Sequence, residues 1–165
     1  MGEPATRFSL DEVVSMLEAA PSRIQAAMAG RSDAELVEPL EPGGWSARDV
    51  LGHVRACDRT WGAYVARILD EDHPSFRAES PRSTIRETDF LAVPFGASLR
   101  AFTDERARLV VRLRDAGTDR LARTALVTLP GRGKEERSAF HYAHRLAEHE
   151  QEHVLHLERS ATAAT

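Results

Sequence analysis

The chain has 165 residues, 42% of them hydrophobic, which is enough for one buried core but not for two full domains, so we expect a single domain over residues 1–165. Its formal net charge is −4 and its charged residues are interspersed, so we expect no cationic face for nucleic acid. Cys57 is the single cysteine, no apolar run approaches the roughly 20 residues that span a bilayer, and no secretory segment follows Met1. These features favour a cytoplasmic protein without membrane contact.

The first predicted helix begins after Ser9, which can cap it while the Glu12 side chain reaches back to complete a capping box. Pro21 is expected to kink or split this helix, and Gly30 is expected to end it. The segment 31–44 contains proline and glycine and is predicted to be a connection.

The second predicted helix has the clearest start in the sequence. Ser46 is its cap, Asp49 is the carboxylate of a capping box, and Trp45 and Val50 occupy hydrophobic staple positions. Apolar residues then recur at helical spacing, so the helix is expected to run to about Asp70.

Two further helices and one extended segment are predicted in the second half of the chain. Residues 71–88 are expected to be loop, and a helix with an apolar stripe is expected from near Pro94 to just before Gly117. The strand-like segment 125–129 precedes a Pro-Gly turn signal, so a short extended excursion is predicted there. A last amphipathic helix is expected from about residue 138 to about residue 160. The pattern predicts an all-α fold: an antiparallel four-helix bundle with long loops after helices two and three.

Two histidines of the last helix, His149 and His153, fall on one face. At about 100° per residue they lie roughly 40° and one turn apart, so both imidazoles can reach one ion. His53 lies on the inward face of the second helix, and a metal site in a bundle core requires such a ligand from a facing helix. Arg145 is assigned to a different arc of the last helix. By itself, an i, i+4 histidine pair is more often a pair of hydrogen-bonded core residues.

Two motifs resemble the DinB-like superfamily of bacterial four-helix bundles. They are Gly44-Trp45-Ser46-Ala47-Arg48-Asp49-Val50-Leu51-Gly52-His53-Val54 and, about a hundred residues later, Ala147-Glu148-His149-Glu150-Gln151-Glu152-His153. The resemblance holds in order and spacing over Leu10–Leu157 and implies one divalent metal ion, Zn or Ni, bound by His53, His149 and His153.

The sequence departs from the superfamily pattern within the last helix. Glu150 and Gln151 stand where small or aromatic residues are expected inside the histidine pair. His141, His144 and His156 are additional histidines. Of these, His156 is nearest to the face of the pair and is an alternative ligand.

Three neutral imidazoles leave the charge of an ion uncompensated and one position open, which is typical of a catalytic site. A water or a small thiol loses its proton more easily at such a metal. The resemblance implies thiol S-transferases, a thiol-dependent isomerase and metal-dependent hydrolases. We therefore expect an enzyme that activates a low-molecular-weight thiol cosubstrate or water against a small electrophile, with S-transfer slightly preferred over hydrolysis. The alternative is a non-catalytic metal-binding stress-response bundle.

Three more residues are candidates for substrate binding. Cys57 lies one turn after His53 and would close the site as a fourth metal ligand, or it is a small buried apolar residue. Tyr64 is near His53 in helical projection and is either a donor to a bound ligand or a core residue. Arg106 interrupts an apolar stripe and either binds a substrate carboxylate or snorkels at the bundle edge.

We also expect a homodimer. Bundles of this resemblance commonly pair, and Val14 and Val110 are assigned to the outer arcs of their helices.

Overall fold

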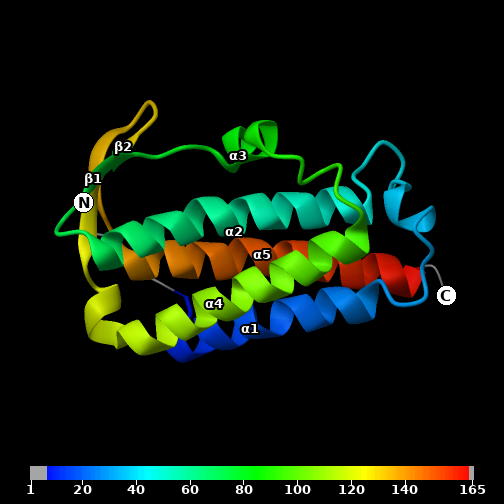
Figure 1. The fold of residues 1–165 in the computed structure, drawn as a ribbon, viewed down its shortest axis with the longest axis horizontal. Coiled ribbons are helices and arrows are strands. Elements are labelled where there is room, and N and C mark those ends of the chain that lie inside the picture. Colours follow the sequence, from blue (N-terminus) through cyan, green and yellow to red (C-terminus); the bar gives the residue numbers. More distant parts are fainter. Residues whose placement is uncertain (1–6, 164–165) are drawn as a thin grey trace.

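Four long helices pack lengthwise in the computed structural model, which describes residues 7–163 (Figure 1). They are α1 (Leu10–Ala27), α2 (Ala47–Asp70), α4 (Phe95–Leu121) and α5 (Ala139–Ala163). The predicted four-helix bundle is confirmed, with a small sheet added to it. α1 and α5 run in one direction and α2 and α4 in the other, because the connection between α2 and α4 returns along the bundle (Figure 1).

Both predicted capping boxes are present, and they fix where α1 and α2 begin. The backbone N–H of Glu12 donates to Ser9 Oγ over 3.3 Å, and the Ser9 N–H donates to the Glu12 carboxylate over 2.7 Å. Asp49 and Ser46 exchange the same two bonds, each 3.1 Å long. The start of α2 sets the height of His53 along the bundle, because His53 lies two turns further along the same helix.

The two predicted helix breakers act differently from one another. Pro21 lies buried inside α1, which continues through it to Ala27, so the expected split is absent. Gly117 does interrupt helical geometry, with φ of 65°, but α4 resumes after it and ends at Leu121. Positive φ is accessible to glycine at little cost, so helical geometry is interrupted at the glycine before which the helix was predicted to end.

The segment predicted as loop over residues 71–88 contains regular structure. It holds the strand β1 (Ser75–Arg77) and the short helix α3 (Pro81–Glu87), which packs on α2. A three-residue strand has little local signal, and β1 exists because it pairs in parallel with a strand about fifty residues later in the chain.

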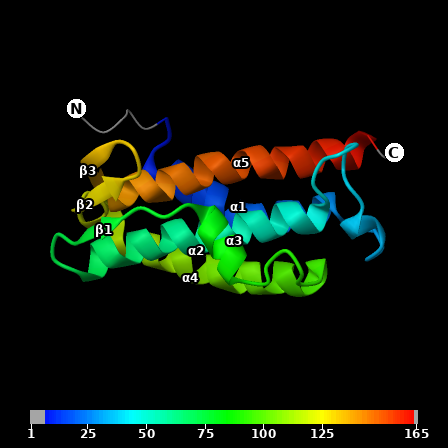
Figure 2. The same ribbon diagram turned by 90° about the horizontal axis from the view of Figure 1, so that it is seen from above.

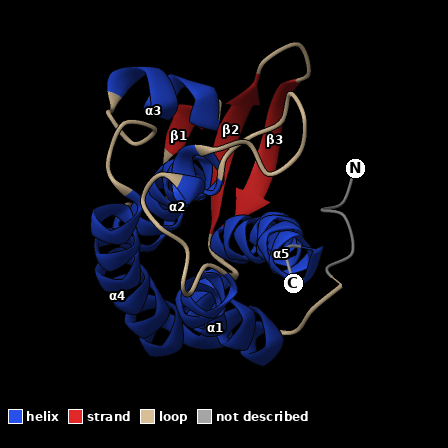
Figure 3. Ribbon diagram, turned by 90° about the vertical axis from the view of Figure 1, so that its right-hand side faces the viewer, coloured by secondary structure: helices blue, strands red, loops and turns tan. Residues whose placement is uncertain are grey.

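That partner strand belongs to the extended excursion that the sequence predicted. β2 (Thr124–Leu129) and β3 (Gly133–Ser138) form an antiparallel hairpin around Gly131, and β1 completes the sheet order β1-β2-β3. Figure 3 shows the sheet beside α2 and α5, away from α1 and α4. The predicted connection over residues 31–44 contains one 3-10 turn, Glu35–Val37.

The return connection touches α2 at Gly52, next to His53. A Cβ atom on Gly52 would lie 2.8 Å from the carbonyl oxygen of Phe90 and 2.8 Å from Cδ2 of Leu91, closer than van der Waals contact allows. Phe90 is buried, and the guanidinium of Arg55 stacks on its ring at 4.1 Å. Only glycine permits the chain to pass this close to the helix.

One buried guanidinium joins all four long helices. Arg106 of α4 is 1% exposed, and its nitrogens donate to Glu150 of α5 over 2.5 Å and to Asp58 of α2 over 2.8 Å. A further donation, over 2.8 Å, goes to the carbonyl oxygen of Leu17 in α1. Burial acts to lower the pKa of Arg106, but Glu150 and Asp58 outweigh it and raise that pKa above its ordinary value. The arginine is therefore charged, and its charge-assisted hydrogen bonds hold two carboxylates inside the core.

The two valines that suggested a dimer lie in the core. Val14 is 5% exposed and Val110 4% exposed, so the assignment of both to outer arcs was wrong. The homodimer stays a prediction, without these residues as its basis. Among the helices of residues 7–163, none combines the length and the apolar character needed to cross a bilayer.

Replacing Arg106 with methionine should lower the free energy of unfolding by about 3–5 kcal/mol, because it leaves two buried carboxylates without their cation. Urea denaturation measures this loss. Arg114→Met is the matched control, since Arg114 pairs with Glu18 on the exposed surface and should change stability little. Equal losses of unfolding free energy in the two variants would show that the buried ion pairs of Arg106 stabilise the fold no more than a surface pair does.

Candidate metal centre

The structure brings His53, His149 and His153 together between α2 and α5, which lie side by side (Figure 2). Nε2 of His149 lies 3.3 Å from Nε2 of His53 and 3.3 Å from Nε2 of His153. The three rings are half-buried, and the ring centroids of His53 and His153 are 4.8 Å apart. α5 supplies two of them one turn apart, and α2 supplies the third from across the interface.

The spacing of these nitrogens fits a shared metal ion. Zn–N bonds of about 2.0–2.1 Å at a tetrahedral angle place two ligand nitrogens about 3.3–3.4 Å apart. Both measured separations, 3.3 Å, match that value. Two neutral imidazoles can share only one proton in such a contact, so three converging Nε2 atoms suit a cation better than a hydrogen-bond network.

The surroundings keep the cluster ready to bind a cation. Burial, followed by the charges of neighbouring side chains, lowers the pKa of His149 and of His153 to about 4. Burial, followed by the charge of Arg82, also lowers the pKa of His53. At neutral pH the imidazoles are therefore uncharged, with lone pairs available. Nδ1 of His149 is buried and has no hydrogen-bond partner among residues 7–163.

Cys57 lies at the edge of the same cluster. Its Sγ is 3.6 Å from Nε2 of His53, and its sulfur, His53 and His149 all present donor atoms within 4.8 Å of one another. A Zn–S bond of about 2.3 Å beside a Zn–N bond would place sulfur and nitrogen about 3.6 Å apart. Burial, then the charge of Glu150, raises the pKa of the Cys57 thiol to about 12. The thiol is thus near enough to be a fourth ligand but is protonated without a metal.

Two tryptophans form the walls of the cluster. The ring centroid of Trp45 lies 5.0 Å from that of His53 and 6.3 Å from that of His153, and Trp45 is 47% exposed. Trp61 is buried, and its ring centroid lies 5.2 Å from that of His149 in a T-shaped arrangement. The sequence analysis assigned Trp45 to a hydrophobic staple and missed this role, although Trp45 and His53 are two turns apart around the start of one helix.

Two cationic side chains near the cluster were also missed. The guanidinium of Arg145 stacks over the ring of Trp61 at 5.0 Å, and its charge contributes to the lowered pKa of His149. Arg82, at the start of α3, contributes in the same way to the lowered pKa of His53. Arg145 lies on the exposed arc to which the sequence assigned it, but it precedes His149 by one turn, so its side chain can reach the rim of the cluster.

Two other candidates lie outside the cluster. Arg106 is in the core with its nitrogens bound to carboxylates and a carbonyl oxygen, so it neither snorkels at an edge nor faces a substrate. Tyr64 shares the face of His53 only in projection, since eleven residues of helix separate them by about 16 Å. Its hydroxyl accepts the backbone N–H of Glu79 over 2.6 Å.

The fourth candidate, His156, is turned toward another partner. Its Nε2 lies 3.1 Å from the carboxylate of Glu41, in the connection after α1. The additional histidine His144 is likewise occupied, because its Nε2 accepts the backbone N–H of Arg7 over 2.9 Å.

Comparison with known proteins identifies the family to which this fold is related. A family model described as the DinB superfamily matches residues 16–157. No curated protein matches the chain.

Three solved structures share the fold. YfiT from Bacillus subtilis, described as a probable metal-dependent hydrolase with an unusual four-helix bundle topology, aligns with a TM-score of 0.78 at 21% identity, over 99% of this chain and 93% of that chain. The four-helix bundle protein TT2238 aligns with a TM-score of 0.61 at 20% identity, over 92% and 99% of the two chains. The mycothiol-dependent maleylpyruvate isomerase aligns with a TM-score of 0.67 at 18% identity, over 91% of this chain but 61% of the isomerase.

Lowering the pH from 7 to 5 should destabilise the metal-free protein through the histidine cluster. The folded pKa of His149 and His153 is about 4, below the ordinary value of 6.5, so the unfolded chain takes up protons in this window while the folded cluster does not. The contribution of these two histidines to the free energy of unfolding is therefore fully present above about pH 6.5 and is lost as the pH falls toward about 4. Urea denaturation in the presence of a chelator measures the slope. The double variant His149→Ala/His153→Ala should show a shallower slope, and parallel slopes would contradict the argument.

Proposed function

The chain belongs to the DinB superfamily, and from this premise we propose that it is a metal-dependent enzyme whose His53, His149 and His153 bind one divalent ion, zinc or nickel. The observation that carries the proposal is the convergence of three Nε2 atoms at 3.3 Å separations from His149. Its reaction is the attack of an activated small thiol, or of water, on a small electrophile.

The bound ion would supply a positive charge that lowers the pKa of a thiol or water beside it. The chain contributes the ligands of the ion and the aromatic rings around them. Three neutral imidazoles add no negative charge, so they leave the attraction for an incoming anion undiminished. Trp45 and Trp61 cover the rings and exclude water from their sides, which strengthens electrostatic interactions at the cluster.

Thiol transfer is slightly preferred over hydrolysis. A ligand set without a carboxylate or thiolate of its own favours a soft anionic partner such as a thiolate. Two of the structurally similar proteins are described by the two chemistries in question, one as a mycothiol-dependent isomerase and one as a probable metal-dependent hydrolase. The shared fold alone does not choose between them.

A non-catalytic metal-binding bundle is the second candidate, and one observation favours it. Sγ of Cys57 lies 3.6 Å from Nε2 of His53, which is the distance between two ligands of one zinc ion. With Cys57 bound, the site would have four protein ligands and no position for a substrate, as in structural zinc sites.

Alanine at His149 or at His153 should weaken binding of zinc or nickel by more than about 100-fold, because changes outside the ligand shell alone cost about 10–100-fold. His53→Ala should have the same effect. His156→Ala is the matched control and should leave affinity unchanged, since His156 is turned toward Glu41. Affinity is measured by competition with a chromophoric chelator. Stoichiometric metal retained in both α5 variants would exclude this ligand set.

A cobalt-substituted protein distinguishes the enzyme from the closed bundle. Adding a small thiol should produce a new sulfur-to-cobalt charge-transfer band, and Cys57→Ser should keep that response. A band that is present before any thiol is added and disappears in Cys57→Ser would show that Cys57 fills the position, which supports the non-catalytic bundle.

A further inference from the structure

The three imidazoles proposed as ligands are uncharged, so they do not balance the charge of a divalent ion. Two carboxylates on the buried side belong to Asp58 and Glu150, the residues that follow Cys57 and His149. Both are bound to Arg106, whose single positive charge offsets part of their combined negative charge.

Arg145 adds a second positive charge at a fixed place. Its guanidinium lies over Trp61 at 5.0 Å, and Trp61 touches the edge of His149. Stacking holds the flat face of the guanidinium and leaves its N–H edge available for a planar, bidentate acceptor. Arg145 is exposed, and no carboxylate within residues 7–163 forms an ion pair with it.

Arg82 brings a third positive charge from a different element. The hydroxyls of Thr60 and Thr84 are 2.7 Å apart and hold α3 against α2. Arg82 is exposed and lies in the first turn of α3. Like Arg145, it has no ion-pair partner in the described part of the chain. Arg82 thus lies on the element that packs against α2, the helix that carries His53.

We propose that Arg145, assisted by Arg82, forms a carboxylate-binding subsite beside the three histidines, so that the thiol used by this protein carries a carboxylate group. This inference rests on the proposed function and specifies its substrate class. The sulfur end of the thiol occupies the open position at the cluster, and the carboxylate accepts hydrogen bonds from the free edge of the Arg145 guanidinium. An uncharged thiol makes the first contact but not the second.

The test compares thiols of similar size and different charge on the cobalt-substituted protein: 3-mercaptopropionate, 2-mercaptoethanol and cysteamine. Dissociation constants come from the sulfur-to-cobalt band. The carboxylate-bearing thiol should bind about tenfold more tightly than 2-mercaptoethanol, the effect expected of a hydrogen bond to a charged group. Arg145→Gln should remove this preference and leave the affinity for 2-mercaptoethanol unchanged, whereas Arg145→Lys should retain part of it.

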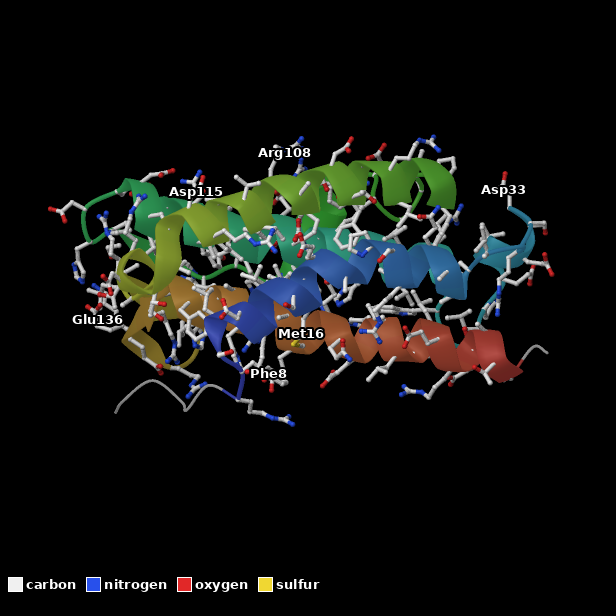
Figure 4. The ribbon with its side chains drawn as sticks, turned by 90° about the horizontal axis from the view of Figure 1, so that it is seen from below. Phe8, Met16, Asp33, Arg108, Asp115 and Glu136 are labelled. Carbon is white, nitrogen blue, oxygen red and sulfur yellow. The ribbon has the colours of Figure 1, made fainter. Side chains whose placement is uncertain are left out.

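Arg108→Gln is the matched control, because it removes one positive charge from the outer surface of α4, on the far side of the bundle from α5 (Figure 4). It should leave the preference intact, and Arg82→Gln should reduce it. Because the ratio between two thiols is compared across variants, differences in thiol acidity cancel, and Arg108→Gln shows how much of a change comes from net charge alone. Equal preference in the wild-type protein and in Arg145→Gln would overturn the subsite while leaving the proposed function standing. Failure of every thiol to produce a band would overturn both.

Discussion

The structure depends on the ion pairs of Arg106 inside the bundle. A buried guanidinium must have its hydrogen bonds satisfied, and here the partners come from three other helices: Glu150, Asp58 and the carbonyl oxygen of Leu17. Sliding α2 or α5 by one turn would leave a charge unpaired in the core. Because Glu150 adjoins His149 and Asp58 adjoins Cys57, the same contacts fix the height at which the histidines of the two helices meet.

Local signals in the sequence predicted the helices, and non-local contacts supplied the rest of the fold. The capping boxes at Ser9 and Ser46 involve residues three apart, so they are visible in sequence and present in the structure. β1 is different, because its three residues form a strand only against β2. Pro21 did not split α1, since burial of the proline in the core compensates for the hydrogen bond that it lacks.

The site shows the same division. His149 and His153 lie one turn apart on one helix, and the structure places His53 opposite them. Pairing of Arg106 with Glu150 and Asp58 was not visible, because helical periodicity shows which face a residue occupies but not which charge it meets across the core. Tyr64 shows the complementary error, since angular projection ignores the rise along the helix. The position of Trp45 depends on a turn before α2, whose path the local sequence does not specify.

Both tryptophans of the chain touch the histidine cluster, Trp45 at its exposed side and Trp61 at its buried side. The indole absorption and emission of this protein therefore originate beside the candidate metal centre and nowhere else. A paramagnetic ion or a chromophoric ligand at the histidines would lie within quenching range of both rings. The fold thus carries an intrinsic optical reporter, in which one fluorophore senses the solvent entrance to the cluster and the other senses its interior.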